Sequence, residues 1–297
     1  MTNLQHEQVT VDGASLHVVT AGPPDAPALV LLHGWPESWA TWRELIALAA
    51  PEYRVVAIDL PGIGGSGRGS APGAKLGIAR LVHGLVTAMG LTGVTLVGHD
   101  IGGMVTYAYL REFPDLPRAV IMDVPLPGVD PWDEFVRSPF LWHFALHAVP
   151  RLPELLVEGR QPGYFGYFYD LLSATRGVPA RDVRAEQVSA YATPDALTAG
   201  FDWYRAFDED VTSNRAAASG PQVATPLLYL RGGAERGGPI DDYADGLRRA
   251  GVAGVRPVMI EGAGHFPHEE AATATWRAIR GFICDTTTVN DRKGACS

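Results

Sequence analysis

The sequence predicts an α/β fold: a mostly parallel sheet, covered by helices on both faces and interrupted by an inserted helical cap. Short apolar runs alternate with segments of helical periodicity over residues 1–124, which is the rhythm of a parallel sheet with crossover helices. Residues 125–224 are rich in aromatic residues and helical patterns and lack strand patterns. Strand patterns then return. We therefore expect a core from 1–124 and 225–284, a cap at 125–224 and a flexible polar tail at 285–297.

Each element is assigned from its own pattern. Two runs around Asp12-Gly13 predict an opening hairpin. Continuous apolar runs predict buried strands, and apolar residues at helical spacing predict the helices between them. The expected strands are 8–11, 15–20, 28–32, 54–58, 94–97, 118–122, 226–230 and 255–260. The expected core helices are 37–50, 75–89 and 271–283.

Length and charge restrict the class of protein. The chain of 297 residues is long enough for one sheet with a cap, and its net charge of −9 argues against nucleic acid or an anionic membrane as a partner. There is neither an apolar run of membrane-spanning length nor a charged and apolar leader, so we expect a cytoplasmic protein. Cys284 and Cys296 give no disulfide framework or metal spacing. The expected partner is a small-molecule substrate, and whether the chain forms a homo-oligomer stays open.

The most informative segment is Gly98-His99-Asp100-Ile101-Gly102, which lies between an apolar run and a helix-like stretch. This layout is typical of a nucleophile elbow, a sharp strand-to-helix turn whose flanking glycines relieve backbone crowding. Most such turns carry serine at the centre, and this one carries aspartate. A carboxylate attacks an electrophilic sp³ carbon more readily than an acyl carbon, so we expect an alkylating substrate such as an epoxide or alkyl halide. The plainer interpretation is an aspartate that caps the next helix.

A second motif, His33-Gly34-Trp35-Pro36, follows the predicted strand 28–32. Here the backbone N–H of Trp35 can join that of Ile101 in an oxyanion hole, which holds the charge of a tetrahedral intermediate. By itself the motif is also compatible with a simple strand-to-loop turn. Combined with an elbow further along the chain, it indicates a catalytic site.

A third motif carries His265, in a loop directly after the last predicted strand. A neutral imidazole at this place can act as the general base that activates water, and we expect activity to fall at low pH as it protonates. A metal site at His265-x-x-His268 is not expected, because Pro267 breaks any helix there and no third ligand is evident. No cofactor is expected either: the glycine-rich segment 62–67 lacks the helix and the later acid of a dinucleotide site.

The acid that orients His265 is less clearly marked. Asp123 directly follows the predicted strand 118–122, and parallel strands bring their carboxyl ends to one edge of a sheet. Glu235 lies in the more usual position, the turn after the penultimate strand, but its glycine-rich loop is poorly suited to aim it. Asp123 is therefore the preferred acid, ahead of Glu235, Asp241 and Asp242. Its role would be to hold the tautomer of His265 and to stabilise the imidazolium.

These motifs resemble those of the α/β-hydrolase superfamily over residues up to about 284, and within it those of the epoxide hydrolases. Haloalkane dehalogenases share the aspartate, but they usually hold the departing halide with an Asn and a Trp. This sequence has Trp35 and Ile101 at those two positions, so it lacks these halide-binding residues. Fluoroacetate dehalogenases are also similar, but they normally place Arg directly after the nucleophile. The resemblance therefore implies an epoxide hydrolase.

The resemblance also implies two cap residues that hold the epoxide oxygen. Trp203-Tyr204-Arg205 matches the family's aromatic-Tyr-Arg motif, which makes Tyr204 one of them. The segment Trp142-His143-Phe144 aligns with the other, so that His143 stands in place of a tyrosine, as in a bacterial subgroup that also places its acid as proposed for Asp123. Substrate contacts are expected from His33, Trp142 and Trp203.

Several alternatives remain at this stage. Instead of His143, one of three cap tyrosines could partner Tyr204: Tyr164, Tyr167 or Tyr169. A dehalogenase could use Trp142, His143 and Tyr204 as halide donors, and halide release would identify it. A receptor on the same fold would bind a small molecule without turnover. The cap aromatics indicate an apolar substrate.

Overall fold

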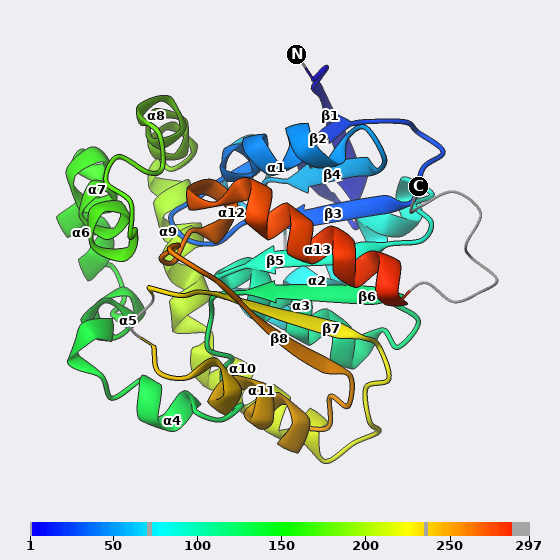
Figure 1. Cartoon of the computed structure of the whole chain (residues 1–297). Helices are drawn as coiled ribbons and strands as arrows, with labels where there is room; N and C mark the ends of the chain where they lie inside the picture. Colours follow the sequence, from blue (N-terminus) through cyan, green and yellow to red (C-terminus); the bar gives the residue numbers. More distant parts are fainter. Residues whose placement is uncertain (1, 70–72, 235–236, 287–297) are drawn as a thin grey trace.

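The computed structural model describes residues 2–69, 73–234 and 237–286, and in this part the chain forms one eight-stranded sheet flanked by helices (Figure 1). The strands are β1 (Gln5–Val11), β2 (Ala14–Ala21), β3 (Ala28–Leu32), β4 (Arg54–Ile58), β5 (Thr95–His99), β6 (Arg118–Met122), β7 (Leu227–Gly232) and β8 (Val255–Ile260). Their order across the sheet is β1-β2-β4-β3-β5-β6-β7-β8. The strands from β4 to β8 in this order are parallel to one another, and β2 is antiparallel to both of its neighbours, β1 and β4.

The predicted α/β fold with a mostly parallel sheet is confirmed. The spans of β3, β4, β6 and β8 coincide with the predicted ones. In β3, β4 and β6 the reason is a short run of mostly buried apolar residues between turn signals, which leaves little freedom in its limits. The other strands differ by at most three residues at either end. One difference matters for the site: β5 continues through His99 and so reaches Asp100 directly.

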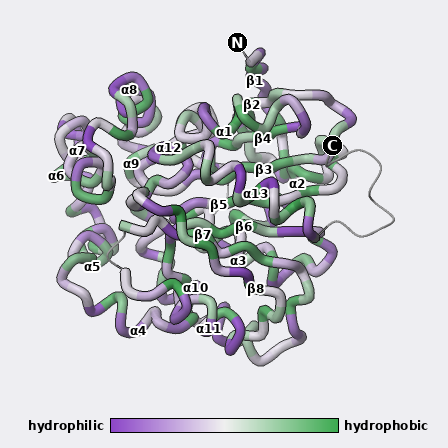
Figure 2. Tube along the Cα trace, in the orientation of Figure 1, coloured by the Kyte–Doolittle hydropathy of each residue, from purple (hydrophilic) through white to green (hydrophobic). Residues whose placement is uncertain are grey.

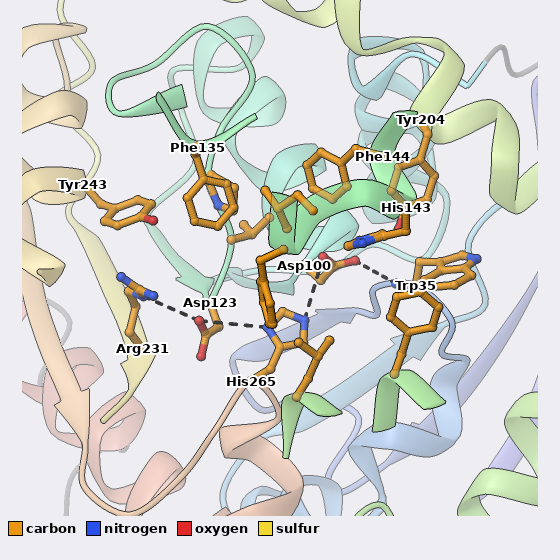
Figure 3. Close-up of a pocket in the computed structure, with 16 residues that line it drawn as sticks. Trp35, Asp100, Asp123, Phe135, His143, Phe144, Tyr204, Arg231, Tyr243 and His265 are labelled. Atoms are coloured by element: carbon orange, nitrogen blue, oxygen red, sulfur yellow. Dashed lines mark hydrogen bonds and ion pairs between the residues drawn. The ribbon is translucent and has the colours of Figure 1, made fainter. Parts of the chain in front are cut away.

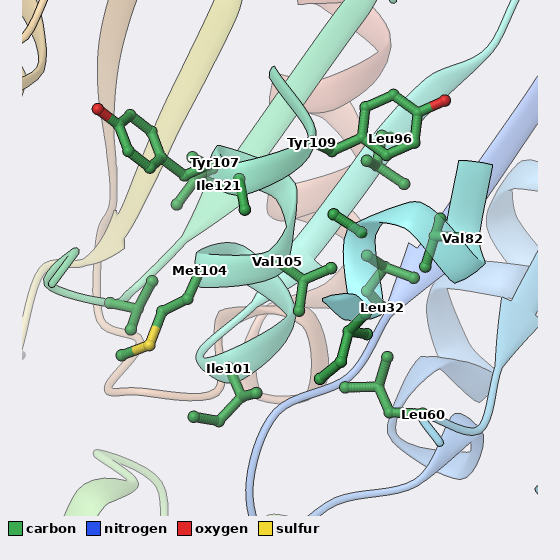
Figure 4. Packing of buried hydrophobic residues seen from close by; sticks show 14 of the residues in the cluster. Leu32, Leu60, Val82, Leu96, Ile101, Met104, Val105, Tyr107, Tyr109 and Ile121 are labelled. Atoms are coloured by element: carbon green, nitrogen blue, oxygen red, sulfur yellow. The ribbon is translucent and has the colours of Figure 1, made fainter. Parts of the chain in front are cut away.

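The helices that cover the sheet form two layers. One layer consists of α1 (Arg43–Ala49), α12 (Pro267–Glu270) and α13 (Ala272–Thr286), and the other of α2 (Lys75–Ala88), α3 (Ile101–Glu112) and α11 (Ile240–Arg249). Side chains along each strand alternate between the two layers, so that Leu29 and Leu31 pack toward α1 and α13 while Val30 and Leu32 pack toward α2 and α3. Figure 4 shows the second of these clusters, in which α3 packs on the sheet through Ile101 and neighbouring apolar residues.

Helix α3 is buried all round, since every residue of 101–110 is buried. A helix without a solvent-facing side cannot shift without breaking the core around it. In Figure 2 the central strands are mainly apolar, while polar residues are frequent on outer helices such as α8. The residue at the N-terminus of α3 is therefore anchored to a helix that is held by the buried core.

All the helices between β6 and β7 belong to the predicted cap region. They are α4 (Trp132–Phe135), η2 (Pro139–Leu141), α5 (Trp142–Ala148), α6 (Leu152–Val157), α7 (Gln161–Leu172), α8 (Arg181–Ala190), α9 (Pro194–Arg205) and α10 (Phe207–Ala218). The described residues of this insertion contain no strand of the sheet. Figure 1 shows most of these helices gathered at the end of the sheet toward which the parallel strands run. None of the helices in the described ranges combines the length and apolar character needed to cross a membrane.

Two of the predicted core helices depart from their expected spans by more than one residue. The expected helix 37–50 is divided into a 3-10 turn, η1 (Trp39–Trp42), and α1, because Ser38 caps the turn and the Glu37 side chain folds back onto the N–H of Gly34. Helix α13 continues through Thr286, two residues into the predicted tail. The rest of that tail, 287–297, and the alternative acid Glu235 lie outside the described residues.

Candidate active site

The turn at Asp100 has the backbone geometry expected of an elbow. Asp100 has φ 48° and ψ −119° and directly precedes α3. Such a conformation costs a non-glycine residue about 1–3 kcal/mol, so it persists only where the surroundings enforce it. Here the buried α3 enforces it on one side, and on the other the Asp100 N–H donates to the carbonyl of Met122 at 3.1 Å.

Two glycines make this turn sterically possible. A Cβ atom on Gly98 would lie 2.1 Å from the carbonyl oxygen of Gly102, and one on Gly102 would lie 2.1 Å from that of Leu32. Neither contact can be relieved by a side-chain rotation, because each involves backbone atoms. The glycine positions read from the sequence are therefore required by contact between main chains.

A second carboxylate residue, Asp123, is held in the same way at the end of the neighbouring strand. Asp123 follows β6, has φ 49° and donates its N–H to the carbonyl of Leu230 at 2.9 Å. Adjacent parallel strands thus both end in an aspartate with positive φ. Nothing in the sequence pattern around Asp123 signals this second turn, which depends on the pairing of β6 with β7.

Figure 3 shows three predicted residues in line: Asp100, His265 and Asp123. Oδ2 of Asp100 lies 3.9 Å from Nε2 of His265, and Oδ1 of Asp123 lies 4.0 Å from Nδ1 of the same ring. Oδ1 of Asp100 accepts a hydrogen bond from the backbone N–H of Trp35 at 2.8 Å. The two carboxylate–imidazole distances exceed those of hydrogen bonds, which is common in ligand-free sites that tighten when substrate binds.

Asp123 also has partners other than His265. Its Oδ2 accepts the N–H of Gly232 at 2.9 Å, and Nε of Arg231 lies 3.5 Å from its Oδ1. The Arg231 guanidinium is buried over the ring of Tyr243, with its carbon 4.5 Å from the ring centroid. Of the other acids considered, Asp241 and Asp242 are exposed on the first turn of α11, away from His265.

Two cap side chains lie across the cavity from these residues: His143 on α5 and Tyr204 on α9 (Figure 3). Burial, assisted by His265, lowers the pKa of His143 to about 3, so its ring is neutral at ordinary pH. Burial raises the pKa of the Tyr204 hydroxyl well above its usual value, and the charge of Asp100 raises it further. Both groups are therefore neutral hydrogen-bond donors.

The tautomer of His143 follows from its surroundings. Its Nδ1 is buried and has no hydrogen-bond partner among the described residues. If Nδ1 carried the hydrogen, a buried N–H would have no acceptor, which is costly. The favoured tautomer therefore carries its hydrogen on Nε2. The ring also packs against Trp35, with the centroids 6.4 Å apart.

The three alternative cap tyrosines do not line the cavity formed by the described residues. The Tyr164 hydroxyl is hydrogen-bonded to Nε2 of His147 at 2.8 Å. Tyr169 donates its hydroxyl to the carbonyl of Pro36 at 2.6 Å, which ties the cap to the loop before α1. Tyr167 is 48% exposed on the outside of α7. These positions favour His143 as the partner of Tyr204.

The cavity lies between core and cap, and more of its lining residues are apolar than polar. The polar side chains of its lining are those of Asp100, Asp123, His143, Tyr204, Arg231 and His265. The apolar wall is formed by Val124, Pro125, Phe135, Phe140, Leu141, Phe144, Phe168, Leu172 and Tyr243. A mainly apolar lining of this kind suits a small ligand that is mostly hydrocarbon.

The predicted substrate contact of His33 needs correction. Its Nδ1 lies 2.8 Å from the carbonyl oxygen of Gly34, and its Nε2 accepts the N–H of Leu60 at 2.9 Å. Burial lowers the pKa of this histidine, although nearby carboxylates oppose the shift. The ring is fully buried and braces two loops, and it does not line the cavity.

The two tryptophans predicted at the substrate are not in the cavity wall either. Trp142 is 41% exposed and stacks from outside on Phe168, with the ring centroids 5.8 Å apart. Trp203 is buried behind α9, where it contributes to a small separate hollow. In each case the neighbour in sequence, His143 or Tyr204, turns toward the cavity, because adjacent helical residues point in directions about 100° apart.

The structure also adds residues that the sequence did not mark. Arg231 and Tyr243 close the end of the cavity farthest from Tyr204, with Phe135 beside them (Figure 3). Arg231 is the penultimate residue of β7 and lies next to Asp123, and only the strand order could have signalled it. Ile101, predicted for the oxyanion hole, has a buried side chain, and its N–H is the first of α3, one of those that a helix leaves without an internal partner.

Comparison with known proteins agrees with this architecture. A family profile described as alpha/beta hydrolase fold matches residues 27–272. The soluble epoxide hydrolase of a Corynebacterium strain is 30% identical over 91% of this chain and 93% of its own length. Epoxide hydrolase A of Mycobacterium tuberculosis is 30% identical, with 93% and 96% covered.

Solved structures give the same result. Cfl2 from Burkholderia cenocepacia is 30% identical and superposes with a TM-score of 0.85, covering 94% of this chain and 96% of its own. The epoxide hydrolase CorEH, determined without ligand, is 27% identical, with a TM-score of 0.86 and coverage of 96% and 100%. The chain belongs to the α/β-hydrolase family and, within it, to the epoxide hydrolase family.

Proposed function

We propose that the protein is an epoxide hydrolase that converts an apolar epoxide to a vicinal diol through a covalent ester on Asp100. The observation that carries this proposal is the placement of two neutral donors, His143 and Tyr204, across one cavity from an elbow aspartate. The named activity of the relatives supports it. A serine at the elbow would favour acyl transfer, whereas a carboxylate opposite two donors favours ring opening.

In the first step Asp100 attacks a carbon of the epoxide. Its Oδ1 is held by the Trp35 N–H at 2.8 Å, which leaves Oδ2 to form the new carbon–oxygen bond. The C–O bond of the ring breaks, and the departing oxygen accepts hydrogen bonds from Tyr204 and from Nε2 of His143. Tyr204 is the proton donor of the pair, because its hydroxyl can transfer a proton to an alkoxide while neutral His143 stabilises the charge.

In the second step water hydrolyses the ester. His265 removes a proton from a water molecule that attacks the Cγ atom of Asp100, and Asp123 stabilises the resulting imidazolium. The amides of Trp35 and Ile101 hold the negative oxygen of the tetrahedral intermediate. Its collapse releases the diol, Asp100 becomes a carboxylate again, and the proton on His265 restores neutral Tyr204. The sum is one epoxide and one water giving one diol.

The test is intact-protein mass spectrometry of His265→Gln after exposure to epoxides and alkyl halides. Without its base the ester should accumulate on Asp100, with a mass increase equal to the whole epoxide. An increase equal to an alkyl group without its halogen would instead establish a dehalogenase. The absence of any adduct on folded protein would contradict the covalent mechanism and favour the receptor.

The structure supports a dehalogenase less well than an epoxide hydrolase. Of the three halide donors it would use, Trp142 is on the outside of the cap, which leaves only His143 and Tyr204 at the cavity. The receptor alternative gives no account of why His265 lies in line between two aspartates.

A further inference from the structure

A fully buried carboxylate–imidazole pair lies directly behind the elbow. Glu37 follows the loop that carries Trp35, and His99 is the last residue of β5. Both side chains are 0% exposed, and Nδ1 of His99 lies 2.8 Å from Oε2 of Glu37. Neither residue has a part in the reaction described above, and neither lines the cavity formed by the described residues. Burying a charged pair is costly, so its retention needs an explanation.

On one side, the Glu37 carboxylate holds the loop of the oxyanion hole. Its Oε2 accepts the N–H of Gly34 at 2.6 Å, and its Oε1 accepts the hydroxyl of Thr41 at 2.9 Å. Burial would raise the pKa of Glu37, but His99 and His268 outweigh burial and hold this pKa well below its usual range. Glu37 is therefore an anion that fixes the residue before Trp35.

On the other side, His99 holds the backbone of the catalytic histidine. Its Nε2 lies 2.8 Å from the main-chain carbonyl oxygen of His265. A carbonyl can only accept, so Nε2 carries a hydrogen, and the ionised Glu37 requires another on Nδ1. His99 is thus an imidazolium with a charge-assisted hydrogen bond in each direction. The His265 N–H is bonded separately, to the carbonyl of Leu172 in the cap at 3.0 Å.

Glu37, His99 and His268 together also have the spacing of metal ligands, since each offers one possible ligand atom and these three atoms lie within 4.8 Å of one another. A metal would need a free lone pair on His99, and both of its ring nitrogens carry hydrogens that face acceptors. Oε2 of Glu37 is already bonded to Gly34 and His99. The cluster is therefore a hydrogen-bond network.

We propose that the Glu37–His99 ion pair is a positioning unit that aligns the Trp35 amide and His265 for hydrolysis of the ester. It forms a continuous chain of bonds from Gly34 through two side chains to His265. This proposal rests on the covalent mechanism given above.

The two steps of the reaction should depend on this pair unequally. Ring opening uses Asp100, Tyr204 and His143, and none of these side chains is bonded to the pair. Hydrolysis requires the Trp35 amide and His265 to act together on one tetrahedral centre, and their two loops are joined through the pair. A displacement of about 1 Å can cost about 100-fold in rate. The Trp35 amide also holds Oδ1 of Asp100 during ring opening, but that step does not require His265. Loss of the pair should therefore slow hydrolysis much more than alkylation.

The experiment is rapid-quench mass spectrometry with excess enzyme and a styrene oxide probe, which measures the formation and decay of the ester separately. In Glu37→Gln and in His99→Gln we expect decay to slow about 10- to 100-fold and formation to change less than about threefold. The double variant Glu37→Gln/His99→Gln removes both charges, so no unpaired charge stays buried, and it should retain the decay defect. Near-UV circular dichroism checks that each variant is folded.

Thr41→Val is the matched control, because it removes the hydroxyl that contacts the other oxygen of Glu37, together with His268 and Glu269, and leaves the chain of bonds to His265 intact. Its ester should decay at close to the wild-type rate. Equal slowing of both steps in the pair variants, or wild-type decay in the folded double variant, would overturn the positioning role. His265→Gln is run in parallel. If an adduct accumulates in His265→Gln but not in the pair variants, only the positioning role is refuted. If no variant accumulates an adduct, the proposed function is refuted as well.

Discussion

The core and the cap position their reactive groups by different physical means. In the core, Asp100 and Asp123 are fixed by strand ends, backbone turns with positive φ and N–H bonds into the next strand. In the cap, His143 and Tyr204 are fixed by the packing of aromatic rings around Trp35. Backbone constraints are local and leave marks in the sequence, such as the elbow glycines. Packing constraints depend on which helices meet, and they leave weaker marks.

The largest effect is expected from removal of the proposed nucleophile, Asp100, in the core. We expect Asp100→Asn to lower kcat/KM for diol formation by a factor on the order of 10⁴, because no ester can form at the normal rate without a carboxylate. Asparagine tolerates the positive φ at this position, so the fold should survive. Chiral chromatography of the diol measures the rate, and circular dichroism is the control. Retention of more than a few per cent of the wild-type activity would contradict the assignment.

The next test contrasts a glycine of the core with one of the cap. Gly98→Ala places a methyl group against backbone oxygen and should lower the free energy of unfolding by about 3 kcal/mol. Gly166→Ala, in α7 with no atom within 4 Å of the new Cβ, should raise it by about 0.5–1 kcal/mol. Urea denaturation measures both. Similar losses at the two positions would show that the elbow is not specially constrained.

The cap donors should affect only the first half of the reaction. Tyr204→Phe should slow ester formation by about 100-fold, since it removes the proton donor. His143→Gln keeps an N–H donor and should slow formation only about tenfold, the equivalent of one hydrogen bond. Ester decay, measured by rapid quench, should stay within about twofold of wild type in both. A larger effect on decay than on formation would place these residues in hydrolysis instead.

Burial of a neutral histidine in the cap also predicts a pH dependence of stability. The pKa of His143 is about 3 in the folded chain against 6.5 for a free imidazole, so between these values the unfolded chain binds a proton that the folded chain does not. The contribution of His143 to the free energy of unfolding is therefore constant above about pH 6.5. As the pH falls below that value, protonation of His143 in the unfolded chain lowers the free energy of unfolding, by about 2 kcal/mol at pH 5. Urea unfolding should show that His143→Gln loses correspondingly less between pH 7 and pH 5. An identical loss in both proteins would refute the buried neutral state.

The smallest effect is expected at Trp142, which points away from the cavity. Trp142→Ala should change kcat/KM by less than about twofold, because the ring is 41% exposed and meets His143 only edge-on from outside the cavity. Steady-state kinetics with one apolar epoxide is sufficient. A loss comparable to that of Tyr204→Phe would restore Trp142 as a substrate contact.

The core was more predictable than the cap. Buried strands show as apolar runs, and the buried strands β3, β4 and β6 coincide with their predicted spans. The elbow was recognisable because backbone crowding demands glycine at fixed distances from Asp100. Both features depend on residues close in sequence, so the pattern contains the necessary information.

What the sequence could not supply depends on contacts between distant segments. Arg231 beside Asp123 follows from the pairing of β6 with β7, and the burial of His33 follows from a loop after β4. Trp142 and Trp203 were expected in the cavity because large aromatics often line apolar sites, yet the helix direction turns their neighbours inward instead. The orientation of a helix on its partner is a tertiary property with no local signature.

The insertion of the cap as one continuous segment after Asp123 has a consequence for engineering the enzyme. Asp100, Asp123 and His265 all lie outside the insertion, as does the Glu37–His99 pair, and the chain leaves and re-enters the sheet at the neighbouring strands β6 and β7. Under the proposed mechanism, a transplanted cap would therefore supply its own groups for the departing oxygen or halide, while the proposed base, His265, would stay unchanged. Exchange of this one segment at its two junctions is a route to new electrophiles that leaves the regeneration of the nucleophile untouched.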